Sequence, residues 1–213
     1  GSLGHMAAFS FHETKNLSSG EGGLLVVNDA RFRCRAEILW EKGTNRAAFR
    51  RGDVDKYCWV DTGSSFLPSD ITAAMLCAQL ESVADVTRTR CELWERYHEG
   101  LKDFAATRGL KLASLPAYPF TANGHLFYVM CRSMAERDAY IDHLRKHGIY
   151  AVFHYLALHQ SPYYRQLTGD DATIPSLPNA ERFASCLLRL PMFASLTQEV
   201  QQRAIRTFLS TPQ

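Results

Sequence analysis

The sequence predicts an α/β fold, and three observations lead to that prediction. The chain has 213 residues, of which 46% are hydrophobic, enough to bury a sizeable core in one large or two modest domains. Short apolar runs typical of strands occur in both the early and the later part of the chain. Between them lie stretches with helical periodicity, bounded by capping residues and glycines.

The first elements are two strands joined by a glycine-rich turn. Apolar and polar residues alternate over Ala7–Phe11, which predicts a strand. The run at 18–23 supplies glycines that can adopt positive φ angles and turn the chain sharply. Leu24–Val27 is the second strand, and Asp29 is expected to cap a helix over residues 30–42.

The middle of the chain is expected to be a loop followed by a long helical stretch. Residues 46–65 show no clear period, and the embedded Trp59 favours a packed loop over a disordered one. Ser69 is a candidate N-cap for helical sequence that runs to Gly109. Because about forty residues is long for one helix, a bend or break is expected near 85–89.

Strands and helices alternate again in the later part, which predicts a small α/β sandwich. Strands are expected at 126–131, 149–155 and 187–190, helices at 135–147, from Asn179 to 186 and after the cap Thr197, and a loop at 162–178.

Composition and charge exclude several classes of function. The net charge is +2 and the acids and bases are well mixed, so nothing favours binding to nucleic acid or to a membrane surface. No apolar run approaches the roughly 18 residues of a membrane span. The cysteines have no metal-ligand spacing, and we expect buried, reduced thiols in a cytoplasmic protein. They are Cys34, Cys58, Cys77, Cys91, Cys131 and Cys186.

Lys15, which follows the first strand, is the sharpest candidate for chemistry. The alternative is a solvated lysine at a strand end. However, Lys15 follows an apolar strand and precedes glycines, which let backbone approach a ligand closely. The nearby hydroxyls of Ser10 and Thr14 could bind phosphate oxygens. An amine that forms a Schiff base must lose its proton, and a partly desolvated pocket favours that loss.

The segment Ser10–Asn16, followed by Gly20–Gly23, resembles the lysine segment of the DegT/DnrJ/StrS family of sugar aminotransferases. The form of residues 12–16 is similar to the branch of dTDP-4-amino-4,6-dideoxygalactose transaminases. Further matches follow in order at 41–46, 54–57, 63–66, 69–70, 152–155 and 189–191. The resemblance implies the fold-type-I architecture of enzymes that depend on pyridoxal 5'-phosphate.

The resemblance also implies a division of the chain. Residues 1–68 correspond to the later part of the large, pyridoxal-phosphate-binding domain, 69–108 to a long linking helical segment, and 109–213 to the small C-terminal α/β domain. The upstream half of the large domain, which in relatives supplies the acid facing the pyridine nitrogen, has no counterpart in these residues. We therefore expect the later part of such an enzyme. The alternative is a truncated, catalytically incompetent structural or oligomerisation module.

Roles follow at matching positions. Lys15 is expected to bind the cofactor covalently and to shuttle the proton, and Ser10 to bind the cofactor phosphate. Ser65 stands where many relatives carry an asparagine that reaches the phosphate across a dimer interface, so that contact is altered. Relatives that act as sugar dehydratases have histidine in place of Lys15, which puts this chain with the aminotransferases.

Substrate-binding candidates are His154, Tyr155 and His159, near a strand end where the family places residues close to the sugar nucleotide. The alternative is packed, structural histidines. Arg50 and Arg51 either meet a pyrophosphate or form an exposed basic pair.

The expected reaction moves an amino group from L-glutamate to carbon 4 of a nucleotide-linked 4-keto-6-deoxy sugar. The resemblance points to dTDP-4-keto-6-deoxyglucose and to a homodimer with shared active sites. The product would feed bacterial surface polysaccharides such as lipopolysaccharide and the enterobacterial common antigen.

Overall fold

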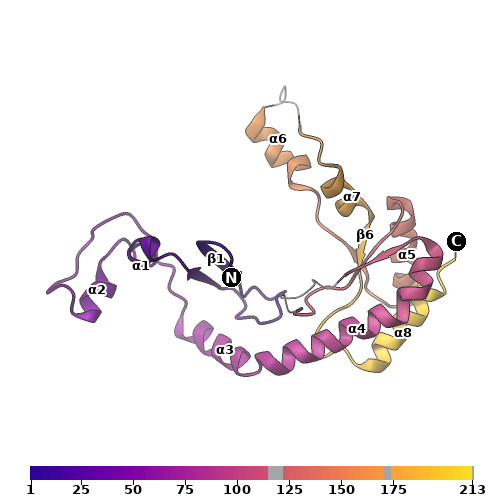
Figure 1. Ribbon diagram of the computed structural model, residues 1–213, viewed down its shortest axis with the longest axis horizontal. Helices are drawn as coiled ribbons and strands as arrows, with labels where there is room; N and C mark the ends of the chain where they lie inside the picture. Colours follow the sequence, from indigo (N-terminus) through magenta and orange to yellow (C-terminus); the bar gives the residue numbers. More distant parts are fainter. Residues whose placement is uncertain (115–121, 170–173, 213) are drawn as a thin grey trace. The chain divides into compact units, whose positions relative to one another are not determined.

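The computed structural model describes residues 1–114, 122–169 and 174–212 (Figure 1). The chain divides into two compact units, Gly1–Ala84 and Asp85–Gln213. No helix in the described ranges is long and apolar enough to cross a membrane.

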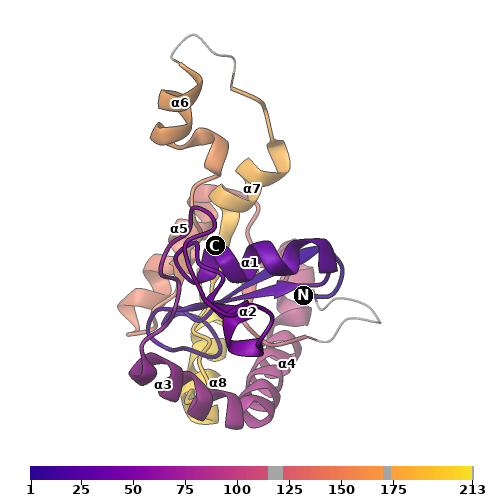
Figure 2. The same ribbon diagram turned by 90° about the vertical axis from the view of Figure 1, so that its left-hand side faces the viewer.

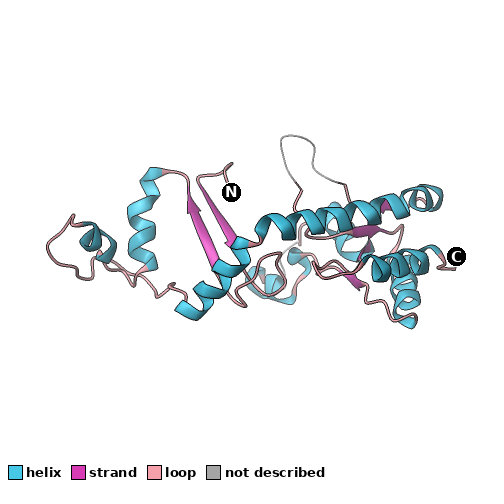
Figure 3. Cartoon of the chain, turned by 90° about the horizontal axis from the view of Figure 1, so that it is seen from below, coloured by secondary structure: helices cyan, strands magenta, loops and turns pink. Residues whose placement is uncertain are grey.

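The first unit opens with the predicted hairpin. Strands β1 (Met6–Ser10) and β2 (Gly23–Val27) pair antiparallel in a register from Met6 opposite Val27 to Ser10 opposite Gly23. Figure 3 shows the two strands side by side in magenta. Both predicted strands are confirmed, and the glycine-rich run lies just before β2.

Helices follow the hairpin, beginning at the predicted cap. The Asp29 side chain accepts the backbone N–H of Arg31 and starts a 3-10 turn (Ala30–Phe32, η1) that continues into α1 (Arg33–Trp40). The expectation of a loop over 46–65 is wrong for its first turn and a half, because α2 (Arg46–Arg51) forms there. Gly52 ends this short helix with a φ of 82°.

The long helical stretch is two helices. Ser69 caps α3 (Asp70–Glu81) by accepting the Thr72 N–H, as predicted. Helix α4 (Val83–Arg108) then starts after Ser82, so the break is real but lies before the expected 85–89. Gly109 follows α4 with a φ of 68°, as a helix-ending glycine requires.

The second unit holds a four-stranded antiparallel sheet in the order β3-β4-β6-β5. Strand β3 (Lys111–Leu112) was not predicted, whereas β4 (Tyr128–Met130), β5 (Val152–Phe153) and β6 (Leu187–Arg189) confirm the three expected strands in shortened form.

Four helices and a 3-10 turn complete the second unit. They are α5 (Met134–Lys146), η2 (Leu158–Gln160), α6 (Pro162–Thr168), α7 (Pro178–Cys186) and α8 (Gln198–Leu209). Two expectations are wrong: α6 occupies the start of the predicted loop, and α7 begins at Pro178 without a side-chain cap from Asn179. Figures 1 and 2 show α6 and α7 on the opposite side of this unit from α4 and α8.

The sheet separates a large core from a small one. Val129 and Leu188 are cross-strand neighbours, fully buried among apolar residues of α4, α5 and α8. Because strand residues alternate between faces, the flanking Met130 and Leu187 point the other way and pack with Cys186. Every buried hydrophobic side chain identified in the described ranges lies between Leu93 and Phe208, within the second unit.

The first unit is different. In Gly1–Ala84, where every residue is described, no hydrophobic side chain is buried, and Trp59 is 79% exposed. Three of the cysteines expected to be buried, Cys34, Cys58 and Cys77, are exposed, so that expectation is wrong for them; Cys131 and Cys186 are buried as expected.

Candidate functional site

Lys15 lies on a loop that leaves the end of β1 and returns before β2. Two backbone hydrogen bonds fasten the base of this loop: the Phe11 N–H donates to the Gly22 carbonyl and the Ser19 N–H to the Phe11 carbonyl, each at 2.9 Å. Within the loop, the Lys15 N–H donates to the His12 carbonyl at 2.9 Å and forms a tight turn. The lysine is thus carried at the tip of a short, closed loop.

The Lys15 side chain is exposed, and among the described residues its amine has no ion pair or hydrogen bond. Residues of the first unit therefore do not supply the partial desolvation expected of a Schiff-base lysine. The carboxylate nearest in sequence on the returning arm, Glu21, instead lies 3.6 Å from the His12 imidazole.

Ser10 ends β1 beside this loop. Its exposed hydroxyl accepts a long hydrogen bond from the His12 N–H at 3.4 Å, and Thr14 contacts the His12 ring at 2.9 Å. The hairpin therefore brings Ser10, Thr14 and Lys15 to one end of β1. Two hydroxyls and one unpaired amine are a donor set that fits a phosphate-bearing aldehyde.

Ser65 is exposed and forms an isolated antiparallel bridge with Glu41. No hydrogen bond or ion pair joins Ser65 to Lys15 within the described residues. The turn beside it is tightly built, since Gly43 has a φ of 78° and a Cβ there would overlap the Asp61 carbonyl oxygen.

Glu41 was not singled out from the sequence, although it opens a segment that matched the family. Its side chain is almost fully buried, and both carboxylate oxygens lack a hydrogen-bond partner among the described residues. The nearest cation is Arg50, 3.6 Å away. Arg51 pairs with Glu37 at 2.9 Å and with Asp53 at 3.0 Å. Both arginines thus have acidic neighbours, which weighs against a pyrophosphate role.

His154 and Tyr155 follow β5 in the second unit and lie next to Arg189 of β6. The Tyr155 side chain is 76% exposed. The centre of its ring lies 5.4 Å from the centre of the His154 ring and 5.9 Å from the Arg189 guanidinium. His154 Nδ1 and Arg189 Nε are buried without hydrogen-bond partners in the described chain. Burial, followed by the Arg189 charge, lowers the pKa of His154, which favours a neutral imidazole.

His159 has a different environment. It is 6% exposed, and its Nε2 lies 3.0 Å from Glu181 Oε1. Glu181 also accepts the Leu177 N–H at the start of α7. His159 therefore links η2 to α7. Within this unit it fits the alternative expectation of a packed, structural histidine.

The structure groups the predicted residues in two sets. Ser10, Lys15 and Ser65 belong to the first unit; His154, Tyr155 and His159 belong to the second. Arg189 was missed from the sequence, because its position beside His154 depends on the pairing of β5 with β6. The Arg189-Leu190-Pro191 match was the only available signal.

Comparisons with known proteins bear on these residues. A model of the DegT/DnrJ/EryC1/StrS aminotransferase family matches residues 1–209. The aminotransferase TlmJ from Streptoalloteichus hindustanus is similar in structure, with a TM-score of 0.83 and 26% identity, over 99% of this chain and 53% of TlmJ. DesV from S. venezuelae, solved in complex with a ketimine intermediate, has a TM-score of 0.80 and 29% sequence identity, over 99% of this chain and 53% of DesV. The putative sugar aminotransferase Spr1654 from Streptococcus pneumoniae, solved in its PMP form, has a TM-score of 0.83 and 25% sequence identity, over 99% of this chain and 52% of Spr1654.

These solved relatives share the fold of the chain, which confirms the fold-type-I architecture expected from the resemblance. The chain spans about half the length of each of them.

Proposed function

The chain belongs to the DegT/DnrJ/EryC1/StrS aminotransferase family, and on that premise we propose that it is part of an enzyme that transfers an amino group from L-glutamate to a sugar carbonyl. The family depends on pyridoxal 5'-phosphate. The observation that best supports the proposal is the Lys15 loop, which presents an unpaired amine and the Ser10 hydroxyl at the end of β1.

The proposed acceptor is a nucleotide-linked 4-keto-6-deoxy sugar. We favour dTDP-4-keto-6-deoxyglucose, giving dTDP-4-amino-4,6-dideoxygalactose for surface polysaccharides, because residues 12–16 resemble that branch of the family. His154, Tyr155 and Arg189 form a polar group in the second unit that suits such a substrate.

Each residue has a proposed task. Lys15 holds the cofactor covalently and, once released, its amine carries the proton removed from the donor's α-carbon. The Ser10 hydroxyl is proposed to donate a hydrogen bond to the cofactor phosphate. Ser65 is proposed to make an altered contact with that phosphate from a second copy of the chain, because many relatives carry an asparagine there. The bound cofactor supplies an electron sink for the bond that is broken. The proposed assembly is accordingly a homodimer.

Covalent capture at Lys15 tests the proposal. The whole protein is incubated with pyridoxal phosphate and reduced with borohydride, and the modified peptide is identified by mass spectrometry. We expect stoichiometric modification of Lys15 and no modification of that segment in Lys15→Ala. Glutamate-dependent amination of dTDP-4-keto-6-deoxyglucose should fall by at least about a thousandfold in the variant, since removing a covalent catalyst removes several kcal/mol of barrier lowering.

The matched control is Lys56→Ala, an exposed lysine of the same unit. It should leave capture and turnover unchanged. Turnover that survives in Lys15→Ala would exclude the proposed mechanism.

A second candidate function is a non-catalytic module, and one observation favours it. All the buried hydrophobic side chains in the described ranges lie in Asp85–Gln213, so this unit has the means to fold without the first. The same capture experiment on the 213-residue chain alone distinguishes the two. A stoichiometric adduct on Lys15 counts against the module, and its absence, with capture intact in the whole protein, supports it.

A further inference from the structure

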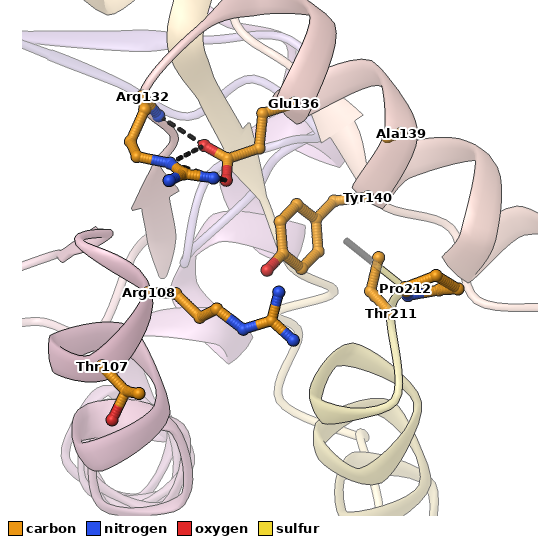
Figure 4. Close-up of a pocket in the computed structure, with 8 residues that line it drawn as sticks. All are labelled: Thr107, Arg108, Arg132, Glu136, Ala139, Tyr140, Thr211 and Pro212. Carbon is orange, nitrogen blue, oxygen red and sulfur yellow. Dashed lines mark hydrogen bonds and ion pairs between the residues drawn. The ribbon is translucent and has the colours of Figure 1, made fainter.

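A pocket of about 360 Å³ lies between α4, α5 and the end of α8, in the second unit. Its walls come from the last turn of α4, the first half of α5 and the residues that follow α8 (Figure 4). None of the residues discussed above as a cofactor or substrate contact lines it. Its charged side chains are Arg108, Arg132 and Glu136, and Tyr140 adds a phenol hydroxyl.

Tyr140 lines this pocket and contributes its hydroxyl to it. The residue is 3% exposed, and its ring stacks on Phe208 at 4.5 Å with an interplanar angle of 18°. Its hydroxyl has no hydrogen-bond partner among the described residues, and Figure 4 shows it directed into the pocket toward Arg108. Burial raises the pKa of Tyr140, so the hydroxyl stays protonated and available as a donor at neutral pH.

Arg108 supplies a positive charge that has no direct ion pair in the described chain. It is half-buried, with its guanidinium 5.0 Å from the centre of the Phe104 ring, and no carboxylate pairs with it in the part of the chain that the structure describes. This guanidinium therefore has its planar donor edge free for an oxyanion.

Arg132 and Glu136 cancel each other at the rim. Glu136 accepts hydrogen bonds from the Arg132 guanidinium at 2.6 and 3.0 Å and from the Arg132 N–H at 2.7 Å. Glu136 forms these hydrogen bonds with Arg132 and none with Arg108, although the charges of Arg108 and Glu136 interact at longer range. The charged side chains that line the pocket leave one net positive charge.

Helix ends add smaller partial charges of both signs. The C-terminal ends of α4 and α8 border the pocket and contribute partial negative charge, while the N-terminal end of α5 contributes partial positive charge. Each end amounts to roughly half a charge and falls off within a turn. The full charge of Arg108 therefore dominates at contact distance.

We propose that this pocket is a binding site for a small oxyanion, the carboxylate or phosphate group of a small molecule, held by the Arg108 guanidinium and the Tyr140 hydroxyl. No residue of the Lys15 loop lines this pocket, and the proposed binding does not depend on the proposed aminotransferase activity. The aliphatic part of Arg108 provides an apolar surface for the remainder of the ligand.

Titration of the full chain, labelled with ¹⁵N, tests the site. Sodium phosphate and sodium acetate are added separately at constant ionic strength, and the Arg108 Nε–Hε signal, identified by its loss in Arg108→Gln, is followed. We expect a saturable shift, and the anion that binds more tightly identifies the source of the oxyanion. Binding by the variants is followed through backbone amide signals around the pocket. Arg108→Gln should weaken binding by about tenfold or more, and Tyr140→Phe should weaken it by about threefold to tenfold.

The controls separate this site from charge in general and from the cofactor site. Arg145→Gln removes an exposed arginine of α5 and should bind as the unaltered chain does. Lys15→Ala should also be unchanged. Tyr140→Phe keeps the ring that stacks on Phe208 and removes only an unpartnered hydroxyl, so it should fold normally. The proposal is overturned if no signal saturates, or if Arg108→Gln and Tyr140→Phe both bind as tightly as Arg145→Gln.

Discussion

Arg90 shows how a buried charge is held in the second unit. Its guanidinium donates to the carbonyls of Gly124 at 3.1 Å, His125 at 2.8 Å and Met192 at 3.2 Å, which come from two distant segments of the chain. No carboxylate pairs with it among the described residues, and burial lowers its pKa from the ordinary value. Carbonyl dipoles thus replace the water that this charge has lost.

Replacement of Arg90 should destabilise the second unit. Arg90→Met leaves three carbonyl oxygens without their donor, and we expect a loss of about 2–4 kcal/mol in the free energy of unfolding. Urea denaturation followed by circular dichroism measures it. Arg88→Met, two residues earlier on the same helix and exposed, should change stability by less than about 0.5 kcal/mol. Equal losses in the two variants would contradict the assigned role.

Glu181 predicts a pH dependence. The hydrogen bond from His159, followed by the one from the Leu177 N–H, lowers the pKa of Glu181 below its ordinary value of 4.5. A carboxyl with a lowered pKa in the folded state contributes stability that is present above pH 4.5 and is lost as the pH falls through the folded pKa. Glu181→Gln should therefore be less stable than the unaltered chain at pH 7, and this difference should shrink toward pH 3.

Denaturation at both pH values, compared with Asp142→Asn, checks this expectation. Asp142 is exposed, with its nearest cation 4.0 Å away, so its replacement should give no comparable pH-dependent difference. A Glu181→Gln deficit that is the same at pH 3 and pH 7 would show that the carboxylate charge is not its cause.

At the level of helices and strands, capping residues were the most reliable sequence signal. Asp29, Ser69 and Thr197 each accept a backbone N–H at a helix start, as expected, whereas Asn179, the fourth expected cap, does not. A cap acts over two or three residues, so local sequence suffices to predict it. By contrast, α2 and α6 were missed because six or seven residues are too few to show a helical period.

The helix α5 allows a test of this local rule. Ser133 caps it by accepting the Glu136 N–H at 3.2 Å. Ser133→Ala should lower the free energy of unfolding by about 1 kcal/mol, since one N–H at the helix start loses its acceptor. Ser133→Asp should retain most of the stability because aspartate also caps. Urea denaturation of the three proteins distinguishes the outcomes, and an equal loss in both variants would contradict a capping role.

The candidate site was predictable only where it is local. Ser10 ends β1 and Lys15 lies in the loop after it, as expected, but Lys15 is exposed and the expected partly desolvated pocket is not formed by the first unit. Arg189 reaches His154 only through strand pairing, and Arg108 and Tyr140 line one pocket only through the packing of the second unit. Such contacts depend on the tertiary arrangement of the chain, which residue spacing does not reveal.

For the whole chain, stability should reside in the second unit. Leu144 is fully buried in its core, whereas Leu24 in β2 is 50% exposed. Leu144→Ala should cost about 2–5 kcal/mol, through lost burial and the cavity left behind, and Leu24→Ala less than about 1 kcal/mol. Chemical denaturation of the 213-residue chain measures both. Similar losses would mean that the hairpin is buried in solution by contacts beyond those described.

The closed base of the Lys15 loop has a kinetic consequence. The entropy of bringing the ends of the loop together is already lost when β1 and β2 pair, so an aldehyde that reaches the amine meets a side chain whose backbone is pre-positioned. Extra residues inserted between the two hydrogen-bonded ends of the loop should therefore slow imine formation without melting the hairpin. The rate of capture then measures how firmly the two strands hold the lysine in place.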